Sequence, residues 1–244
     1  MLAFSKFQPG DRVLDAGCGS GSFLMSLSKL GANVLALDSA PEHLVDISHR
    51  AGAPSLLVQG IVDVLPLASE SLDGIWCANT LQFLDDIELR SALSEFKRVV
   101  RPGGLIAIKD VDMTAFKIAP ASPFLGSHLA EACVTTEKPA KESHGSLRGR
   151  DLRAIMQAAG FRDVKQRSFL IERWGPLTGY EAAFWRDWLP YLADLAALHG
   201  VPEADLETWS LVSSPEAADA FIGRPDFYGC ELQVVCIGSK AARL

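Results

Sequence analysis

Near its start the chain reads Val13-Leu14-Asp15-Ala16-Gly17-Cys18-Gly19-Ser20-Gly21, followed by Ser22-Phe23-Leu24. The first apolar residues predict a buried strand that ends in an acidic residue, and the residues after Gly21 predict the start of a helix. Glycine is needed where the backbone takes a positive φ or where a ligand approaches too closely for a Cβ. Doubly wound α/β folds bind nucleotide-like ligands at a glycine turn between a strand and a helix N-terminus. The stretch therefore predicts both a fold class and the place of a ligand site.

The composition is that of a globular protein with an acidic balance. The chain has 244 residues, of which 48% are hydrophobic and 22% charged, and its formal net charge is −7. This length allows one large core with an added lid. A negative field repels phosphate backbones, so we expect no nucleic-acid partner. The most basic stretch, 138–153, is diluted by acidic residues and is interpreted as a solvated surface.

The cysteines and the hydropathy pattern indicate in which cellular compartment the protein is expected. The five cysteines are odd in number and scattered, with no C-x-x-C pair, so we expect neither a disulfide framework nor a metal site. The start shows no signal-peptide pattern, and no apolar run approaches the roughly 20 residues of a membrane span. We expect a cytoplasmic protein without a membrane partner.

Strand-like and helix-like segments alternate over residues 12–110. Helices are predicted between the first two strands and after Pro41, and another ends at Pro102-Gly103-Gly104. Because βα units in a row build parallel sheets covered by helices, we expect a doubly wound parallel sheet. The strand-like runs are 12–15, 33–38, 55–59, 74–78 and 105–110.

Regularity fades after Asp110, and residues 111–150 are expected to form loops and a short helix. A helix is predicted at 152–159, and two more strands at 161–173 and 231–238. The connection between these strands is roughly 55 residues long, and insertions of that length are more often lids or binding elements than plain loops.

Three classes of ligand bind at such a glycine turn. A P-loop requires Lys-Ser/Thr after its last glycine, where this chain has Ser22-Phe23. A dinucleotide fold has G-x-G-x-x-G, but here the third glycine comes one residue early, at Gly21. Asp38, at the end of the second strand, fits the ribose hydroxyls of a dinucleotide or of another adenosine ligand. It does not distinguish between these two ligands.

Five motifs in order carry a closer resemblance. Together they resemble the class I S-adenosylmethionine-dependent methyltransferases, in the group similar to the enzymes of ubiquinone and menaquinone biosynthesis. The resemblance covers about residues 10–112 and the last two strands. The motifs are Asp15-Ala16-Gly17-Cys18-Gly19-Ser20-Gly21, Leu35-Ala36-Leu37-Asp38, Val64-Leu65-Pro66-Leu67, Leu72-Asp73-Gly74-Ile75-Trp76 and Val99-Val100-Arg101-Pro102-Gly103-Gly104.

The resemblance implies a fold, a cofactor and a domain plan. The fold is α/β and Rossmann-like, with a doubly wound seven-stranded sheet that is mostly parallel and has an antiparallel last strand. The cofactor is S-adenosyl-L-methionine. We expect residues 1–174 and 228–244 to form the cofactor-binding core and residues 175–227 to form a helical lid or substrate-binding insertion.

The family's pattern implies a role for each residue of the glycine turn and the second strand. Gly17, Gly19 and Gly21 would let the methionine portion of the cofactor lie against the backbone. Asp15 would hold the turn and meet the cofactor's ammonium group. Asp38 would accept hydrogen bonds from both ribose hydroxyls.

The residues that would contact the adenine differ in part from the family's pattern. Ser39 would border the adenine, but the run Gly60-Ile61-Val62-Asp63 stands where the family commonly has Gly-Asp-Ala. Either Ile61 packs on the adenine while the Val62 backbone binds its edge, or Asp63 replaces the usual aspartate. We favour the first interpretation, and in either case the cofactor affinity is expected to be somewhat reduced.

Polar residues farther along complete the expected site. The resemblance places Asn79 and Gln82 near the sulfonium. His128 and His144, in the irregular region after the sheet, are candidates for a general base if the acceptor is a hydroxyl. His43, in the second helix, is expected to be a surface residue.

Aromatic residues of the insertion are the candidate acceptor pocket. Tyr180, Phe184 and Trp188 recur at helical spacing, which suits ordinary core packing as well as a pocket wall. Trp174 and Tyr228, at either end of the insertion, are further pocket candidates.

These observations predict transfer of a methyl group to oxygen, nitrogen or carbon of a small, partly apolar molecule by SN2 displacement. The sulfonium activates the methyl group, so in-line positioning in a dry pocket is the main requirement. The alternative is a cofactor-binding regulatory or partner-binding module without methyl transfer. A methyltransferase of macromolecules ranks third and a nicotinamide dehydrogenase last. A small-molecule acceptor is the expected partner, and a homodimer is left open.

Overall fold

A computed structural model of the chain describes residues 1–49, 56–135 and 147–243. It divides into two compact units. Unit 1 comprises Met1–Asp110, Arg148–Phe169 and Val234–Leu244, and unit 2 comprises Val111–Leu147 and Leu170–Gln233. Three long strands contribute residues to both units.

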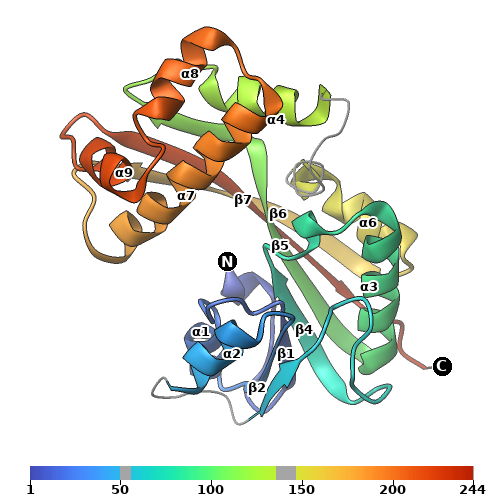
Figure 1. The fold of residues 1–244 in the computed structure, drawn as a ribbon. Coiled ribbons are helices and arrows are strands. Elements are labelled where there is room, and N and C mark those ends of the chain that lie inside the picture. The colour runs from blue at the N-terminus through green and yellow to red at the C-terminus, as the bar shows by residue number, and fades with distance from the viewer. Residues whose placement is uncertain (50–55, 136–146, 244) are drawn as a thin grey trace. The chain divides into compact units, whose positions relative to one another are not determined.

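Seven strands of the described residues form one sheet, in the order β3-β2-β1-β4-β5-β7-β6 (Figure 1). The pairs from β3 to β5 are parallel, whereas β7 runs antiparallel between β5 and β6. The predicted fold class is confirmed. The strands are β1 (Arg12–Ala16), β2 (Asn33–Asp38), β3 (Leu56–Gln59), β4 (Leu72–Ala78), β5 (Val100–Ala119), β6 (Arg162–Trp174) and β7 (Tyr228–Ser239).

Helices connect these strands. Short 3-10 helices lie at Leu2–Phe4, Leu81–Phe83 and Gly149–Asp151. The α-helices are α1 (Leu24–Lys29), α2 (Pro41–Ser48), α3 (Asp86–Val99), α4 (Leu125–Thr135), α6 (Leu152–Ala158), α7 (Gly179–His199), α8 (Glu203–Ser210) and α9 (Pro215–Ile222).

In unit 1 the sheet is covered on both faces. Along β5, Ile106 and Ile108 belong to the buried cluster that contains apolar residues of α3 and α6, while Ala107 belongs to the cluster with residues of α1 and α2. Successive strand residues point to opposite faces, so this alternation shows that one helix pair lies on each side. Figure 1 shows α1 and α2 on one side of β1 and β4, with α3 on the other.

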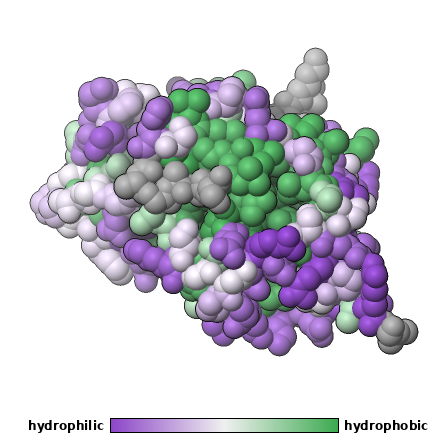
Figure 2. Space-filling view, turned by 90° about the horizontal axis from the view of Figure 1, so that it is seen from below, coloured by the Kyte–Doolittle hydropathy of each residue, from purple (hydrophilic) through white to green (hydrophobic). Residues whose placement is uncertain are grey.

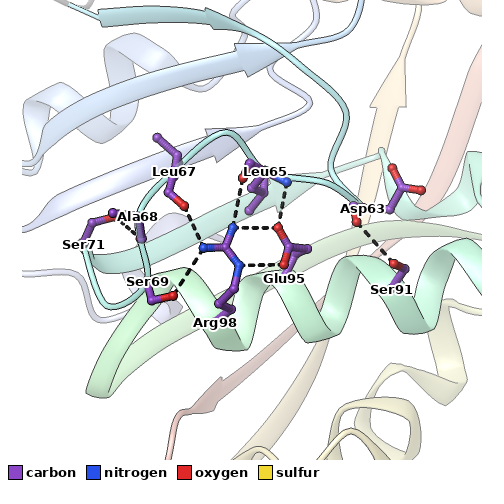
Figure 3. A network of polar contacts seen from close by, with 9 residues as sticks. All are labelled: Asp63, Leu65, Leu67, Ala68, Ser69, Ser71, Ser91, Glu95 and Arg98. Atoms are coloured by element: carbon purple, nitrogen blue, oxygen red, sulfur yellow. Dashed lines mark hydrogen bonds and ion pairs between the residues drawn. The ribbon is translucent and has the colours of Figure 1, made fainter.

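The segment between β3 and β4 contains no helix, which corrects the expectation that strands and helices alternate throughout residues 12–110. Side chains of α3 anchor this segment instead (Figure 3). The Arg98 guanidinium donates hydrogen bonds to the carbonyl oxygens of Leu65 at 2.9 Å and Leu67 at 2.7 Å. Glu95 accepts from the Leu65 amide at 2.8 Å and also binds Arg98. These bonds satisfy backbone groups that a helix would otherwise pair internally.

Strand β5 is much longer than predicted. It continues past Asp110 to Ala119, where the sequence was expected to form loops and a short helix. Phe116 and Ile118 are buried while Lys117 between them is exposed, which is the alternation of a strand with one buried face. The short helix expected in this region is α4.

Unit 2 has a core of its own. Phe116 of β5 packs against aromatic residues of the helices: its ring centroid lies 6.0 Å from that of Trp185 and 6.4 Å from that of Trp209. Both tryptophans are fully buried. The residues predicted as a helical insertion, 175–227, contain α7, α8 and α9.

Several large apolar side chains remain exposed in the described part of the chain. They include Ile61, Val64 and Phe83 in unit 1, and Trp174 and Tyr180 in unit 2. One face of the molecule carries a broad apolar area bordered by hydrophilic residues (Figure 2). None of the helices described here has the length and apolar character needed to cross a membrane.

Candidate active site

The glycines of the turn after β1 differ in how much room there is for a side chain: Gly17 has none and Gly19 has open space beside it. Gly17, Gly19 and Gly21 have φ values of 73°, 49° and 79°, which an L side chain rarely adopts. A Cβ at Gly17 would overlap the side chain of Thr80, whereas a Cβ at Gly19 would meet no atom within 4 Å. The space beside Gly19 is therefore where a ligand can approach the backbone.

The Asp38 carboxylate closes the turn from the end of β2. It is 8% exposed and accepts hydrogen bonds from the amides of Gly19 at 2.7 Å and Ala40 at 3.0 Å. His43 Nδ1 lies 3.2 Å from Asp38 Oδ1, and because a carboxylate only accepts, the imidazole donates. Although its side chain is 42% exposed, His43 contacts the candidate site. This contact was not predicted from the sequence, where His43 was expected only to be a surface residue.

Asp15 is a buried carboxyl group with spare hydrogen-bonding capacity. It is 1% exposed, and within the described residues its Oδ2 atom has no hydrogen-bond partner. Burial, with the charge of Asp38 as a second cause, raises the pKa of Asp15 to about 7. An unpartnered buried acceptor suits a ligand with a cationic N–H donor. The same surroundings raise the pKa of Cys18 to about 12, so this residue is a packed thiol and not a nucleophile.

Charged and polar residues meet where β4 ends beside the middle of β5. Asn79 has φ 54°, its amide donates to the Lys109 carbonyl at 2.7 Å, and its carbonyl accepts from Gln82 at 3.3 Å. The Lys109 ammonium group donates to Asn79 Oδ1 at 2.7 Å. Asp110 is 1% exposed, with an Oδ1 atom unpartnered among the described residues. Burial raises the pKa of Asp110 to about 7, although the charges of Lys109 and Arg148 oppose the shift.

Asn79 and Gln82 were predicted from the sequence as site residues, whereas Lys109 and Asp110 were not. Both ionisable residues are almost fully buried at the end of an otherwise apolar run, Leu105-Ile106-Ala107-Ile108. Charged residues are rarely buried without a partner. A lysine and an aspartate directly after such a run are therefore a signal that could have identified them.

The segment after β3 presents an apolar side chain next to Asp38. The Gly60 amide donates to the Asp38 carbonyl at 3.0 Å, which brings this segment close to the end of β2. Ile61 is 51% exposed, while Val62 is buried and Ser39 is exposed. This arrangement agrees with an Ile61 side chain available to an adenine, which stays a prediction.

Of the two candidate bases, the structure describes only His128. Its Nδ1 atom lies 2.6 Å from Oδ2 of Asp205, a residue of α8 that is 3% exposed. The ring of Phe124 stacks on the imidazole at 6.0 Å. The buried carboxylate fixes Nδ1 as the donor and leaves Nε2 as the acceptor. His144 lies outside the described residues.

The five predicted pocket residues all belong to unit 2 and differ in burial. Phe184 and Trp188 pack against the buried core of that unit, and Tyr180 and Trp174 are 76% and 64% exposed. Trp174 and Tyr228 lie with their ring centroids 5.7 Å apart, and the Tyr228 hydroxyl donates to a Glu172 oxygen at 2.9 Å. Their role in binding an acceptor stays a prediction. No three His, Cys, Asp or Glu side chains gather as a metal site in the ranges that the structure covers.

A family comparison matches the part of the chain that holds this site. Residues 14–108 match the family model described as a methyltransferase domain. Over this segment, which is less than half of its length, the chain is thus similar to methyltransferases. The segment contains the second half of β1 and all of β2, β3 and β4, with the glycine turn, Asp38 and Asn79. The predicted resemblance to class I methyltransferases is confirmed.

Sequence relatives align mainly with the methyltransferase domain. The malonyl-[acyl-carrier protein] O-methyltransferase of Serratia marcescens is 35% identical over 106 residues, which are 43% of this chain and 40% of that protein. An uncharacterized methyltransferase of Synechocystis is 29% identical over 164 residues, 66% of this chain and 71% of that protein. The chain thus spans about two fifths of the length of the first of these relatives.

Solved structures share the fold over nearly the whole chain. The YcgJ protein from Bacillus subtilis has a TM-score of 0.58 at 19% identity, covering 100% of this chain and 97% of that one. Phosphoethanolamine N-methyltransferase 2 of Haemonchus contortus, in complex with S-adenosyl-L-methionine, has a TM-score of 0.55 at 14% identity, covering 98% of this chain and 50% of that one. At these identities the likeness shows the fold alone.

Proposed function

We propose that the chain is an S-adenosyl-L-methionine-dependent methyltransferase that acts on a small, partly apolar molecule. The observation that carries this proposal is the glycine turn of the methyltransferase domain. Its open face at Gly19 lies beside the Asp38 carboxylate, and the turn follows a buried Asp15 with an unpartnered oxygen. A backbone cradle with two carboxylates suits a ligand that has hydroxyl groups at one end and an ammonium group at the other.

Each part of the cofactor has a residue in this chain that fits it. Asp15 would accept from the ammonium group, and the turn from Gly17 to Gly21 would contact the methionine chain. Asp38 already accepts from backbone amides, but a carboxylate has about four lone-pair sites. His43 occupies a third site, so one stays available for a ribose hydroxyl, and the second hydroxyl would take the place of His43. Ile61 would cover the adenine. The bound sulfonium supplies an electrophilic methyl group, and the protein orients it and excludes water.

The acceptor is assigned to residues of unit 2. The aromatic side chains of Trp174, Tyr180, Phe184, Trp188 and Tyr228 would contact a partly apolar molecule. For a hydroxyl acceptor, His128 Nε2 would take the proton as the oxygen–methyl bond forms and the methyl–sulfur bond breaks. Asp205 would then stabilise the imidazolium. His144 remains the second candidate for this role.

The names of the related proteins leave the methylated atom open. One is an O-methyltransferase of an acyl-carrier-protein substrate and another is an N-methyltransferase of phosphoethanolamine. Phenols, amines and carboxylic acids therefore all belong in a first acceptor screen with cofactor labelled in the methyl group.

Isothermal titration calorimetry with S-adenosyl-L-methionine and its demethylated product tests the cofactor directly. We expect both to bind at one site per chain. If neither binds, the proposed function is wrong. If both bind but no acceptor in the screen takes up label, the alternative of a cofactor-binding regulatory or partner-binding module gains support.

A further inference from the structure

Lys109 is a buried cation at the edge of the candidate site. Only 4% of it is exposed, and its ammonium group lies 2.7 Å from the Asn79 side-chain oxygen. Its backbone carbonyl accepts from the Asn79 amide, also at 2.7 Å. Lys109 therefore holds Asn79 through both its backbone and its side chain.

A buried lysine at this position lowers the free energy of unfolding, because its ammonium group is removed from water. The register pairs Lys109 with Ala78, and the residues before it on β5, Ile106, Ala107 and Ile108, are apolar and fully buried. Removing an ammonium group from water carries a large desolvation penalty, and well-packed apolar residues often stabilise such positions better. A buried charge beside a ligand site is more readily explained by function than by stability.

The bond to Lys109 determines how the Asn79 amide is presented. The side-chain oxygen of Asn79 accepts from Lys109, and within the described residues its side-chain nitrogen donates to no group. Its backbone amide is the one that donates to the Lys109 carbonyl. Because oxygen and nitrogen share one planar group, fixing the oxygen also fixes the directions of the two N–H bonds. The left-handed backbone of Asn79, at φ 54°, is held by the same lysine.

We propose that Lys109 is a positioning residue of the cofactor site: it orients Asn79 so that the amide N–H groups bind the carboxylate-bearing methionine end of the cofactor. This inference rests on the proposed function. The ligand has an acceptor group at that end, and Asp15 and Asp110 supply only carboxyl groups there. Lys109 and Asn79 thus provide the donors that a carboxylate needs.

The test compares two ligands that differ only at this end. S-adenosylhomocysteine carries the amino-acid chain, whereas 5′-methylthioadenosine has the same adenosine with a methyl group in its place. We expect Lys109→Met and Asn79→Ala each to weaken S-adenosylhomocysteine binding by about tenfold, the size of a lost hydrogen bond to a charged group. Binding of 5′-methylthioadenosine should change less than about twofold.

A double-mutant cycle separates positioning from general damage. If Lys109 acts through Asn79, the double variant binds S-adenosylhomocysteine about as weakly as either single variant, and additive losses overturn the proposal. Lys97→Met is the matched control, because Lys97 also donates at 2.7 Å, to the Ala159 carbonyl, but belongs to α3 away from the turn. It should leave both affinities unchanged.

Further outcomes are equally decisive. Equal weakening of both ligands by Lys109→Met indicates a structural role and contradicts the proposal. If Lys109→Met does not fold, Lys109→Gln, which removes the charge but keeps a donor group, takes its place in the cycle. Failure of the unmodified protein to bind S-adenosylhomocysteine would instead refute the proposed function, so the two failures are distinguishable.

Discussion

Gly17 packs directly against Thr80. The Thr80 hydroxyl lies 3.2 Å from the Gly17 carbonyl oxygen, and a Cβ on Gly17 would overlap the threonine side chain. The space beside this glycine is thus filled by the protein itself, while the space beside Gly19 is empty. The glycines of one turn therefore serve different purposes, packing at one position and ligand approach at the other.

Alanine at these two glycines should separate stability from affinity. Gly17→Ala forces both a positive φ and an overlap, and we expect a loss of about 2–4 kcal/mol in the free energy of unfolding. Gly19→Ala adds only backbone strain, about 1 kcal/mol. It should nevertheless weaken S-adenosylhomocysteine binding by at least tenfold. Urea unfolding and calorimetry on both variants check this, and full affinity in Gly19→Ala would place the ligand elsewhere.

Asp38 should be essential for cofactor affinity. We expect Asp38→Ala to weaken binding by tenfold or more, because two hydrogen bonds from the ribose to a charged acceptor are lost. His43→Ala frees one lone pair of the Asp38 carboxylate, so its effect should be much smaller, within about threefold. Calorimetry with S-adenosyl-L-methionine measures both variants. A larger loss for His43→Ala than for Asp38→Ala would contradict this ranking.

Cofactor binding should depend on pH through Asp15. Its pKa is raised from 3.8 to about 7, so the carboxyl group of the empty protein is neutral below that pH. The cationic cofactor favours the carboxylate, so binding lowers this pKa and releases a proton. Affinity should rise as the pH increases toward about 7 and level off above it. Calorimetry at pH 6.5 in buffers of different ionisation enthalpy detects the proton, and Asp15→Asn should abolish most of the release.

The raised pKa of Asp15 also affects the free energy of unfolding of the protein without cofactor. Between pH 3.8 and about 7 the folded state binds more protons at Asp15 than the unfolded chain does. Its contribution to the free energy of unfolding therefore falls as the pH rises through this window. We expect Asp15→Asn to stabilise the empty protein at pH 8, by on the order of a few kcal/mol, while it weakens cofactor binding. Thermal unfolding at pH 5 and 8 checks the sign.

Arg98 should matter for stability more than for binding. Its guanidinium carries the bonds that hold residues 65–67 to α3 (Figure 3). Because the side chain is 35% exposed, water replaces part of what is lost, and we expect Arg98→Ala to cost about 1–2 kcal/mol. The control is Arg150→Ala, which removes an exposed pair with Asp151 and should cost less than about 0.5 kcal/mol. Similar losses in urea unfolding of the two variants would contradict this account.

The parts of the fold that depend on local pattern were predictable from the sequence. Glycine spacing and the acidic ends of β1 and β2 predicted the turn and its two carboxylates. Periodicity predicted the strands of the parallel half of the sheet and the helix stripe of α7. These features depend on neighbours in the chain, so one sequence is sufficient to recognise them.

Features that depend on distant partners were not predictable in the same way. Lys109 becomes meaningful only when β5 pairs with β4 and brings it to Asn79, thirty residues earlier. The absence of a helix before β4 depends on Arg98, which stabilises the segment from another element. His43 was interpreted as a surface residue because nothing in its helix shows that Asp38 faces it. Such contacts follow from the tertiary fold and not from residue spacing.

The five cysteines form no disulfide in the described part of the chain and all are buried, so none of them presents a reactive thiol at the surface. A spectroscopic label can therefore be attached to introduced cysteines with little background. Ser28 on α1 and Ala197 on α7 are exposed positions in different units, and Ser28→Cys with Ala197→Cys would carry a pair of labels. The distance between the labels, measured with and without cofactor, would then test whether cofactor binding changes the arrangement of the two units. The buried thiols thus make the protein suited to single-molecule work without replacement of a native cysteine.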